Sequence, residues 1–142
     1  MSLTKPTEAR RIFVVDEQAK QRREIKKAMW KALGDCEFAE AGSVVEARDV
    51  LRKEMLPFDL AIISIRRETG NPEEDGRDLA REITARNPRT AIIIVTALPG
   101  IVPERIESGL YSEQSFISQV EPGLLSERLQ TEAKALLQAA GV

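Results

Sequence analysis

Phe58-Asp59-Leu60-Ala61-Ile62-Ile63-Ser64-Ile65-Arg66 is the stretch that decides the fold of this chain. Within it, Leu60–Ile65 is an almost unbroken apolar run without the alternation of polar and apolar residues that marks a half-exposed strand. A short, isoleucine-rich run between chain-breaking and polar flanks predicts a strand that is buried on both faces of a parallel sheet. Its one polar side chain, Ser64, stands near the carboxyl end of the run. Functional sites of open α/β sheets form at that end.

The size and charge of the chain fit one compact domain. It has 142 residues, enough to bury roughly two-thirds of the surface that the unfolded chain exposes. Lys and Arg total 21 and Asp and Glu total 23, so the formal net charge is −2, whereas a general nucleic-acid binder is basic. No apolar run reaches the length of a membrane span, and the N-terminus lacks a signal-peptide pattern. These features predict a cytoplasmic domain over residues 11–140, preceded by a flexible lead-in over residues 1–10.

Histidine and cysteine usage excludes several kinds of chemistry. The chain has no histidine, which rules out histidine acid–base catalysis, histidine metal ligands and a phosphohistidine intermediate. Its single cysteine, Cys36, cannot form an intramolecular disulfide or a Cys-x-x-Cys metal site. We expect Cys36 to be a small, partly buried residue.

Hydrophobic patterns along the chain alternate between strands and helices. Besides Leu60–Ile65, strands are predicted at Arg11–Val15, Glu37–Ala41, Ala91–Thr96 and Ser115–Ser118. Helices are predicted at Gln18–Leu33, Val44–Met55, Asp75–Arg86, Pro103–Leu110 and Leu124–Ala140. Five strand–helix repeats with short loops imply parallel strands, right-handed crossovers and helices on both faces. The prediction is an α/β, doubly wound, five-stranded parallel sheet of order 2-1-3-4-5, a flavodoxin-like three-layer sandwich.

Polar residues follow or end several of the predicted strands. Asp16 and Glu17 end the first strand, Ser64 the third, Thr96 the fourth and Gln119 the fifth. In the predicted strand order these ends share one crevice beside the first and third strands. Two adjacent carboxylates suit a hard divalent cation such as Mg²⁺. A hydroxyl and an amide suit a bound anion or a water molecule.

Five segments, taken in order, resemble the signature segments of one protein family. They are Ile12–Glu17, Asp59–Arg66, Asp75-Gly76, Ile93–Ala97 and Phe116–Gln119. Together they resemble the receiver domain of two-component response regulators, over roughly residues 11–138. In that family the segments are the acidic-pair strand, the phosphoacceptor strand, the Asp-Gly before the third helix, the switch-threonine strand and the aromatic-x-x-lysine strand. The resemblance implies phosphorelay signal transduction rather than enzyme catalysis.

Two departures from the family pattern change the expected chemistry. Ser64 stands where the family has its phosphate-accepting aspartate, and Gln119 stands where it has a lysine. A serine cannot form an acyl phosphate, and its hydroxyl is a poor nucleophile without an activating base. Removing one member of a buried ion pair strands a charge at a cost of about 3–5 kcal/mol, whereas removing both members avoids that cost. The paired loss therefore predicts a pseudo-receiver that is not phosphorylated on aspartate.

The remaining pocket residues have a family role and a plainer structural one. With two carboxylates instead of three, Asp16 and Glu17 are expected to hold Mg²⁺ weakly at most, so that no cofactor is required. Their plainer role is to cap the following helix. Thr96 and Phe116 occupy the family's switch positions. Without an acyl phosphate we favour a strand residue and a core aromatic at these two positions.

The resemblance also implies the kind of partner. In this family the face of the fourth helix, fifth strand and fifth helix mediates dimers or contacts with an output domain. Here that face would include Ile106, Leu110 and Leu124–Ala140. We expect a protein partner (a histidine kinase, an output domain or a second copy) and neither nucleic acid nor membrane.

Two other functions compete with the pseudo-receiver. The first is a phosphorylation-competent receiver with an atypical acceptor or magnesium site, in which Glu73 or Asp75 replaces the missing carboxylate. The second is an enzyme or nucleotide binder. It lacks support, because Asp16-Glu17-Gln18 stands after the first strand where a glycine-rich phosphate loop would be.

Overall fold

The computed structural model describes residues 9–65, 72–96, 114–118 and 125–139. The strands are β1 (Arg10–Val15), β2 (Cys36–Ala41), β3 (Leu60–Ile65), β4 (Ala91–Thr96) and β5 (Gln114–Ser118). The helices are α1 (Ala19–Leu33), α2 (Val44–Lys53), α3 (Pro72–Arg86) and α4 (Leu125–Ala139). The helix predicted at Pro103–Leu110 lies outside the described residues, as does the predicted site residue Gln119.

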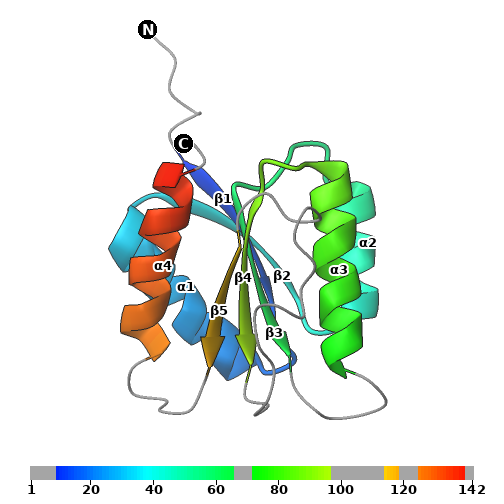
Figure 1. Ribbon diagram of the computed structural model, residues 1–142, viewed down its shortest axis with the longest axis horizontal. Helices are drawn as coiled ribbons and strands as arrows, with labels where there is room; N and C mark the ends of the chain where they lie inside the picture. The colour runs from blue at the N-terminus through cyan, green and yellow to red at the C-terminus, as the bar shows by residue number, and fades with distance from the viewer. Residues whose placement is uncertain (1–8, 66–71, 97–113, 119–124, 140–142) are drawn as a thin grey trace, which may run out of the picture.

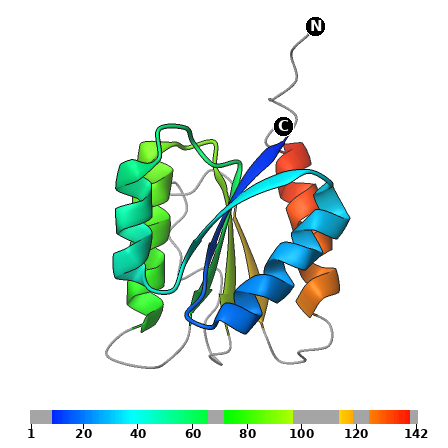
Figure 2. The same cartoon turned by 180° about the vertical axis from the view of Figure 1, so that it is seen from behind.

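All the strand pairs are parallel, and the sheet has the order β2-β1-β3-β4-β5. Helices α1 and α4 cover one face, and α2 and α3 cover the other (Figure 1 and, from behind, Figure 2). The predicted α/β class with a parallel sheet is confirmed. The carboxyl ends of β3, β4 and β5 point to one edge of the sheet, the lower edge in Figure 1.

The core consists of two apolar layers separated by the sheet. Successive strand residues point to opposite faces, so that Ile62 packs with α1 and α4 while Ile63 packs with α2 and α3. Both side chains are almost completely buried. The predicted burial of β3 on both faces is confirmed, and it explains why this strand shows no polar alternation.

Helix α2 begins at the predicted residue, Val44, after a Ser43 cap, and ends earlier than predicted. Ser43 Oγ accepts a hydrogen bond from the Glu46 backbone N–H at 3.0 Å, and Glu46 Oε1 accepts one from the Gly42 backbone N–H at 2.6 Å. The helix ends at Lys53 instead of Met55. Glu54, the residue after the helix, has an extended backbone, and Met55 is almost fully exposed, so no burial favours another turn there.

Helix α3 begins at Pro72, three residues before the predicted start at Asp75. The predicted helix, Asp75–Arg86, did not include Pro72–Glu74. Proline is favoured at the first helical position, and acidic residues are favoured in the first turn, where they face the positive end of the helix dipole. The charge pattern of Pro72–Asp75 therefore fits a helix start better than a loop.

Candidate functional site

The candidate site lies at the carboxyl edge of the sheet, where β1 and β3 end side by side. Val15 is paired with Ile63 across these strands, which brings the next residues, Asp16 and Ser64, to neighbouring strand ends. Alternation along each strand points Asp16 and Ser64 to the same side of the sheet as Val14 and Ile62, the side covered by α1 and α4. The structure thus brings together the two residues on which the sequence argument depends.

Asp16 is the buried acid of the site. It is only 1% exposed, and its Oδ1 accepts a hydrogen bond from the Gln18 backbone N–H at 2.8 Å. This bond bridges the end of β1 and the start of α1, so the carboxylate also has the helix-start role considered for it. Its neighbour Glu17 is exposed, which leaves the two acids of the predicted pair in different surroundings.

Ser64 has an unusual environment for a serine. Its Oγ is buried and finds no hydrogen-bond partner among the described residues. Burying a hydroxyl without a partner costs roughly 1–3 kcal/mol, so such a group calls for an explanation.

The other predicted site residues are placed only by their backbone, or not at all. Thr96 is the last residue of β4 and is paired with Ile65 of β3 and Ser118 of β5. Phe116 lies in β5, paired with Ile94. These positions set Thr96 at the same edge as Ser64, one strand away, and Phe116 farther back along β5.

A basic cluster beside Asp16 was missed by the sequence analysis. Arg22 of α1 donates from Nη1 to the Asp16 backbone carbonyl at 2.6 Å and from Nε to Glu40 Oε1 at 2.9 Å. Lys26, one turn later, donates to Glu40 Oε2 at 2.5 Å. The Lys26 hydrogen bond, with a further contribution from Arg22, lowers the pKa of Glu40 below its ordinary value.

The spacing of Arg22 and Lys26 in the sequence could have predicted part of this cluster. Arg22 and Lys26 are four residues apart, which places them on one face of a helix. Their acid, Glu40, lies on β2, and the β1–β2 pairing that brings it near α1 is a tertiary contact. Spacing along the chain thus places the two cations on one helix face, whereas their acidic partner depends on the tertiary fold.

The described residues contain no group of three or more histidine, cysteine, aspartate or glutamate side chains placed to hold a metal ion. At the candidate site the described acids are Asp16 and Glu17, and the third strand end carries the Ser64 hydroxyl.

Comparison with known proteins gives the fold. No protein-family model matches the sequence, and no curated protein matches it. Solved structures do match, among them a response regulator receiver domain protein from Clostridium thermocellum (19% identity, TM-score 0.69, 92% of this chain and 95% of that one). The phosphorylated cyanobacterial phytochrome response regulator RcpA matches with 16% identity and a TM-score of 0.72, over 92% and 96% of the two chains. The chain has the receiver-domain fold.

A third receiver-fold relative was solved with a ligand. The response regulator protein TrrA from Thermotoga maritima, in complex with Mg²⁺-BeF, shares 22% identity with a TM-score of 0.65, over 89% of this chain and 98% of that one. At such identities the likeness concerns the fold and leaves the chemistry of this chain to its own residues. Over the segments that the structure describes, none of the helices is both long and apolar enough to cross a membrane.

Proposed function

We propose that this domain is a pseudo-receiver of two-component signalling, which is not phosphorylated on aspartate and acts through protein–protein interaction. The observation that carries the proposal is the Ser64 hydroxyl at the end of β3, beside the buried Asp16. In the receiver domains that the sequence resembles, an aspartate occupies this strand end and accepts the phosphoryl group. A serine at that place leaves the fold intact and removes the acceptor.

The electrostatics of the strand ends support the same proposal. Gln119 follows β5 at the position of the family's lysine, so both charges of the phosphorylation switch are replaced by neutral groups. The Ser64 Oγ also has no base bonded to it among the described residues, and an unactivated hydroxyl is a poor nucleophile. The domain would have no enzymatic activity of its own and would act in the cytoplasm, where two-component phosphorelays operate.

The proposal extends to the metal. Asp16 and Glu17 would bind Mg²⁺ weakly, and no cofactor would be needed for folding. A Ser64→Asp variant should bind Mg²⁺ more tightly than the natural chain, because a third carboxylate is added beside the first two. The two proteins are compared by titrating each with Mg²⁺ and monitoring the amide chemical shifts of residues 15–18.

Treatment with acetyl phosphate and Mg²⁺ tests the function directly. The natural chain should show no phosphoryl mass gain in intact-protein mass spectrometry, and Ser64→Asp combined with Gln119→Lys should gain a hydroxylamine-sensitive phosphoryl group. A phosphoryl group on the natural chain, either acid-resistant and base-labile or hydroxylamine-sensitive, would overturn the pseudo-receiver in favour of a phosphorylation-competent receiver with an atypical acceptor. A double variant that folds but takes no phosphate would show that the pocket differs at further positions.

The partner is proposed to be a protein that contacts the end of the domain formed by β5 and α4. Helix α4 packs its apolar side against the sheet, through Leu129, Ala133, Leu136 and Leu137. Its polar side is exposed and carries Glu127, Arg128, Thr131 and Lys134. An exposed face with charges of both signs suits a polar protein surface rather than nucleic acid. Cross-linking through Lys134, with Lys53 on the opposite side as the control, locates the contact in the presence of a cognate kinase or output domain.

A further inference from the structure

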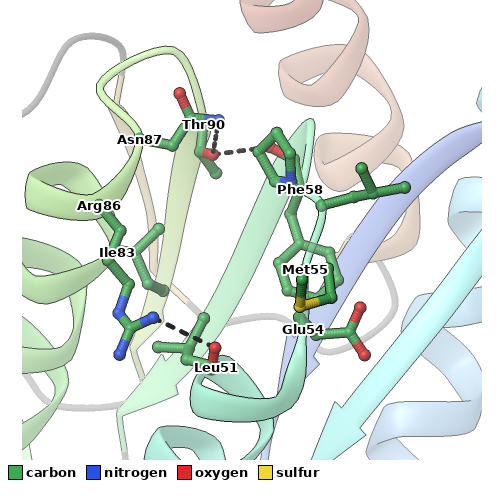
Figure 3. A pocket seen from close by; sticks show the side chains of 10 residues that line it. Leu51, Glu54, Met55, Phe58, Ile83, Arg86, Asn87 and Thr90 are labelled. Carbon is green, nitrogen blue, oxygen red and sulfur yellow. Dashed lines mark hydrogen bonds between the residues drawn. The ribbon is translucent and has the colours of Figure 1, made fainter.

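A pocket of about 430 Å³ opens at the amino-terminal edge of the sheet, opposite the candidate site. It lies between the last turns of α2 and α3, and its wall continues along the segments that lead into β3 and β4 (Figure 3). The residues around it are Leu51, Glu54, Met55, Leu56, Pro57, Phe58, Ile83, Arg86, Asn87 and Thr90. Its volume is within the range of small-molecule sites, roughly 300–1,000 Å³.

The floor of the pocket is apolar and firmly held. Leu51, Phe58 and Ile83 belong to the buried core layer beneath α2 and α3. Thr90 is also buried, and its Oγ1 donates to the Phe58 carbonyl at 2.6 Å, which fixes the two walls relative to each other. The Phe58 ring is stacked on Phe13 with 4.9 Å between the ring centroids. The shape therefore does not depend on a ligand to form it.

The rim exposes apolar surface that the fold does not use. Among the described residues four large apolar side chains are exposed, and two of them, Met55 (92%) and Leu56 (64%), are neighbours on this rim. Exposed apolar groups next to a concave apolar surface indicate a place where something binds. Methionine is flexible and polarisable, so Met55 can fold over an apolar ligand of irregular shape.

The charged residues that line the pocket favour an anionic ligand. The charge of Glu54 is already paired, because Arg11 Nη2 donates a hydrogen bond to its carboxylate. Arg86 is exposed and donates from Nη1 to the Leu51 backbone carbonyl at 3.2 Å, but no carboxylate of the described residues pairs with it. A guanidinium has five N–H donors, so this bond leaves donors for an anionic group. The pocket thus combines an apolar floor with one uncompensated positive charge at its mouth.

From this arrangement we propose that the pocket binds a small amphipathic carboxylate: an apolar chain or ring on Leu51, Phe58 and Ile83, with its carboxylate on Arg86. The site is separate from the Asp16–Ser64 site, and its existence does not depend on the proposed function. The bond from Arg86 to α2 remains in place, because it uses another of the guanidinium donors.

Octanoate and 1-octanol are matched probes for this site, since they share the apolar chain and differ in the acidic group. Methyl resonances of ¹³C-labelled methionine report on binding: Met55 lies on the rim, while Met29 is buried in the other core layer and serves as an internal control. Octanoate should shift the Met55 methyl resonance saturably and leave that of Met29 unchanged. It should bind about twofold to fivefold more tightly than 1-octanol, the gain of one partly exposed charge pair. Added salt should weaken octanoate binding and spare 1-octanol.

Variants of two nearby arginines separate a specific charge contact from a general one. Arg86→Gln should bind both probes with equal affinity, whereas Arg89→Gln, also exposed but absent from the pocket wall, should behave like the natural chain. The proposal is overturned if Met55 shows no saturable shift, if Met29 shifts with it, or if the natural chain binds the two probes equally. It is also overturned if Arg89→Gln loses as much affinity for octanoate as Arg86→Gln does. If Arg86→Gln does not fold, the affinities of the natural chain for octanoate and 1-octanol, measured with and without added salt, still test the proposal.

Discussion

Arg11 fixes the segment between α2 and β3 with a single side chain. Its Nη1 donates to the Leu56 carbonyl at 2.5 Å and to the Pro57 carbonyl at 2.8 Å, and its guanidinium lies 4.7 Å from the centre of the Phe58 ring. Together with its ion pair to Glu54, these contacts satisfy backbone carbonyls that no strand or helix pairs. Arg11 thereby holds the rim of the pocket as well as the entry to the central strand.

Replacing Arg11 by glutamine should therefore cost more than an ordinary surface substitution. We expect Arg11→Gln to lower the free energy of unfolding by about 1–2 kcal/mol, because charge-assisted hydrogen bonds and the contact with Phe58 are lost together. Urea unfolding measures this loss. Arg52→Gln is the matched control, since Arg52 is exposed and its partner among the described residues, Asp49, belongs to the same helix. This variant should cost less than about 0.5 kcal/mol. Equal losses in the two variants would contradict the special role of Arg11.

Glu40 gives the stability a defined dependence on pH. The hydrogen bond from Lys26, assisted by Arg22, lowers the pKa of Glu40 in the folded protein, so the folded state prefers the charged carboxylate. This stabilisation is present above the ordinary glutamate pKa and is lost as the pH falls through the lowered value. Because the carboxylate is partly exposed, we expect Glu40→Gln to cost about 1 kcal/mol at most at pH 7.

The test is the difference in unfolding free energy between the natural chain and Glu40→Gln, measured from pH 7 to pH 3. The difference should shrink toward zero at the acid end. Glu24→Gln, on the exposed side of α1, is the control at pH 7 and should stay within about 0.5 kcal/mol of the natural chain. A Glu40 effect that grows in acid would contradict the lowered pKa.

At the residue scale, sequence reasoning found the strand-end residues and missed the contacts made across elements. Asp16 and Ser64 were predictable because parallel strands of known order bring their carboxyl ends together. The Arg22–Glu40–Lys26 cluster was not, since its acid comes from a different element. The exposure of Glu17 could not be predicted either. Nothing in the sequence shows which of two adjacent acidic residues faces the core.

At the scale of single elements, some helix ends can be predicted from the local sequence more easily than others. The Ser43–Glu46 pair was readable as a cap because its spacing is fixed by the geometry of one helical turn. The start of α3 was misplaced because Pro72 and the following acids give no apolar periodicity, and their preference for a helix start was overlooked. Apolar spacing locates the middle of a helix, whereas capping chemistry locates its ends.

The cap of α2 can be tested by substitution. Ser43→Ala removes the acceptor for the Glu46 backbone N–H and should lower the free energy of unfolding by about 1 kcal/mol. Ser43→Asp should restore most of this loss, because a carboxylate can accept the same hydrogen bond. Val45→Ala, at a position that is 76% exposed in the same turn, is the control and should stay within about 0.5 kcal/mol of the natural chain. An alanine at 43 as stable as serine, in thermal or urea unfolding, would show that the cap is dispensable.

At the scale of the whole molecule, the fold was predictable because its central strands are buried on both faces. Such strands must be apolar along their whole length, and β3 and β4 therefore stand out in the sequence as runs without polar alternation. The outer strand β2 is less buried, and its apolar pattern in the sequence is correspondingly weaker. Burial, rather than strand propensity alone, decided how clearly each strand could be read.

The shared sheet should also make the two core layers unfold together. Ile62 and Ile63 are consecutive residues of β3, but each supports a different layer. We expect Ile62→Val and Ile63→Val each to cost about 1 kcal/mol, the usual effect of removing one buried methylene. Because the strand links both layers, either substitution should lower the protection of slowly exchanging amides equally in α1 and α3, as in one cooperative unit. Native-state hydrogen exchange measures this. If Ile63→Val weakens only α3 and Ile62→Val only α1, the layers open separately and the sheet does not couple them.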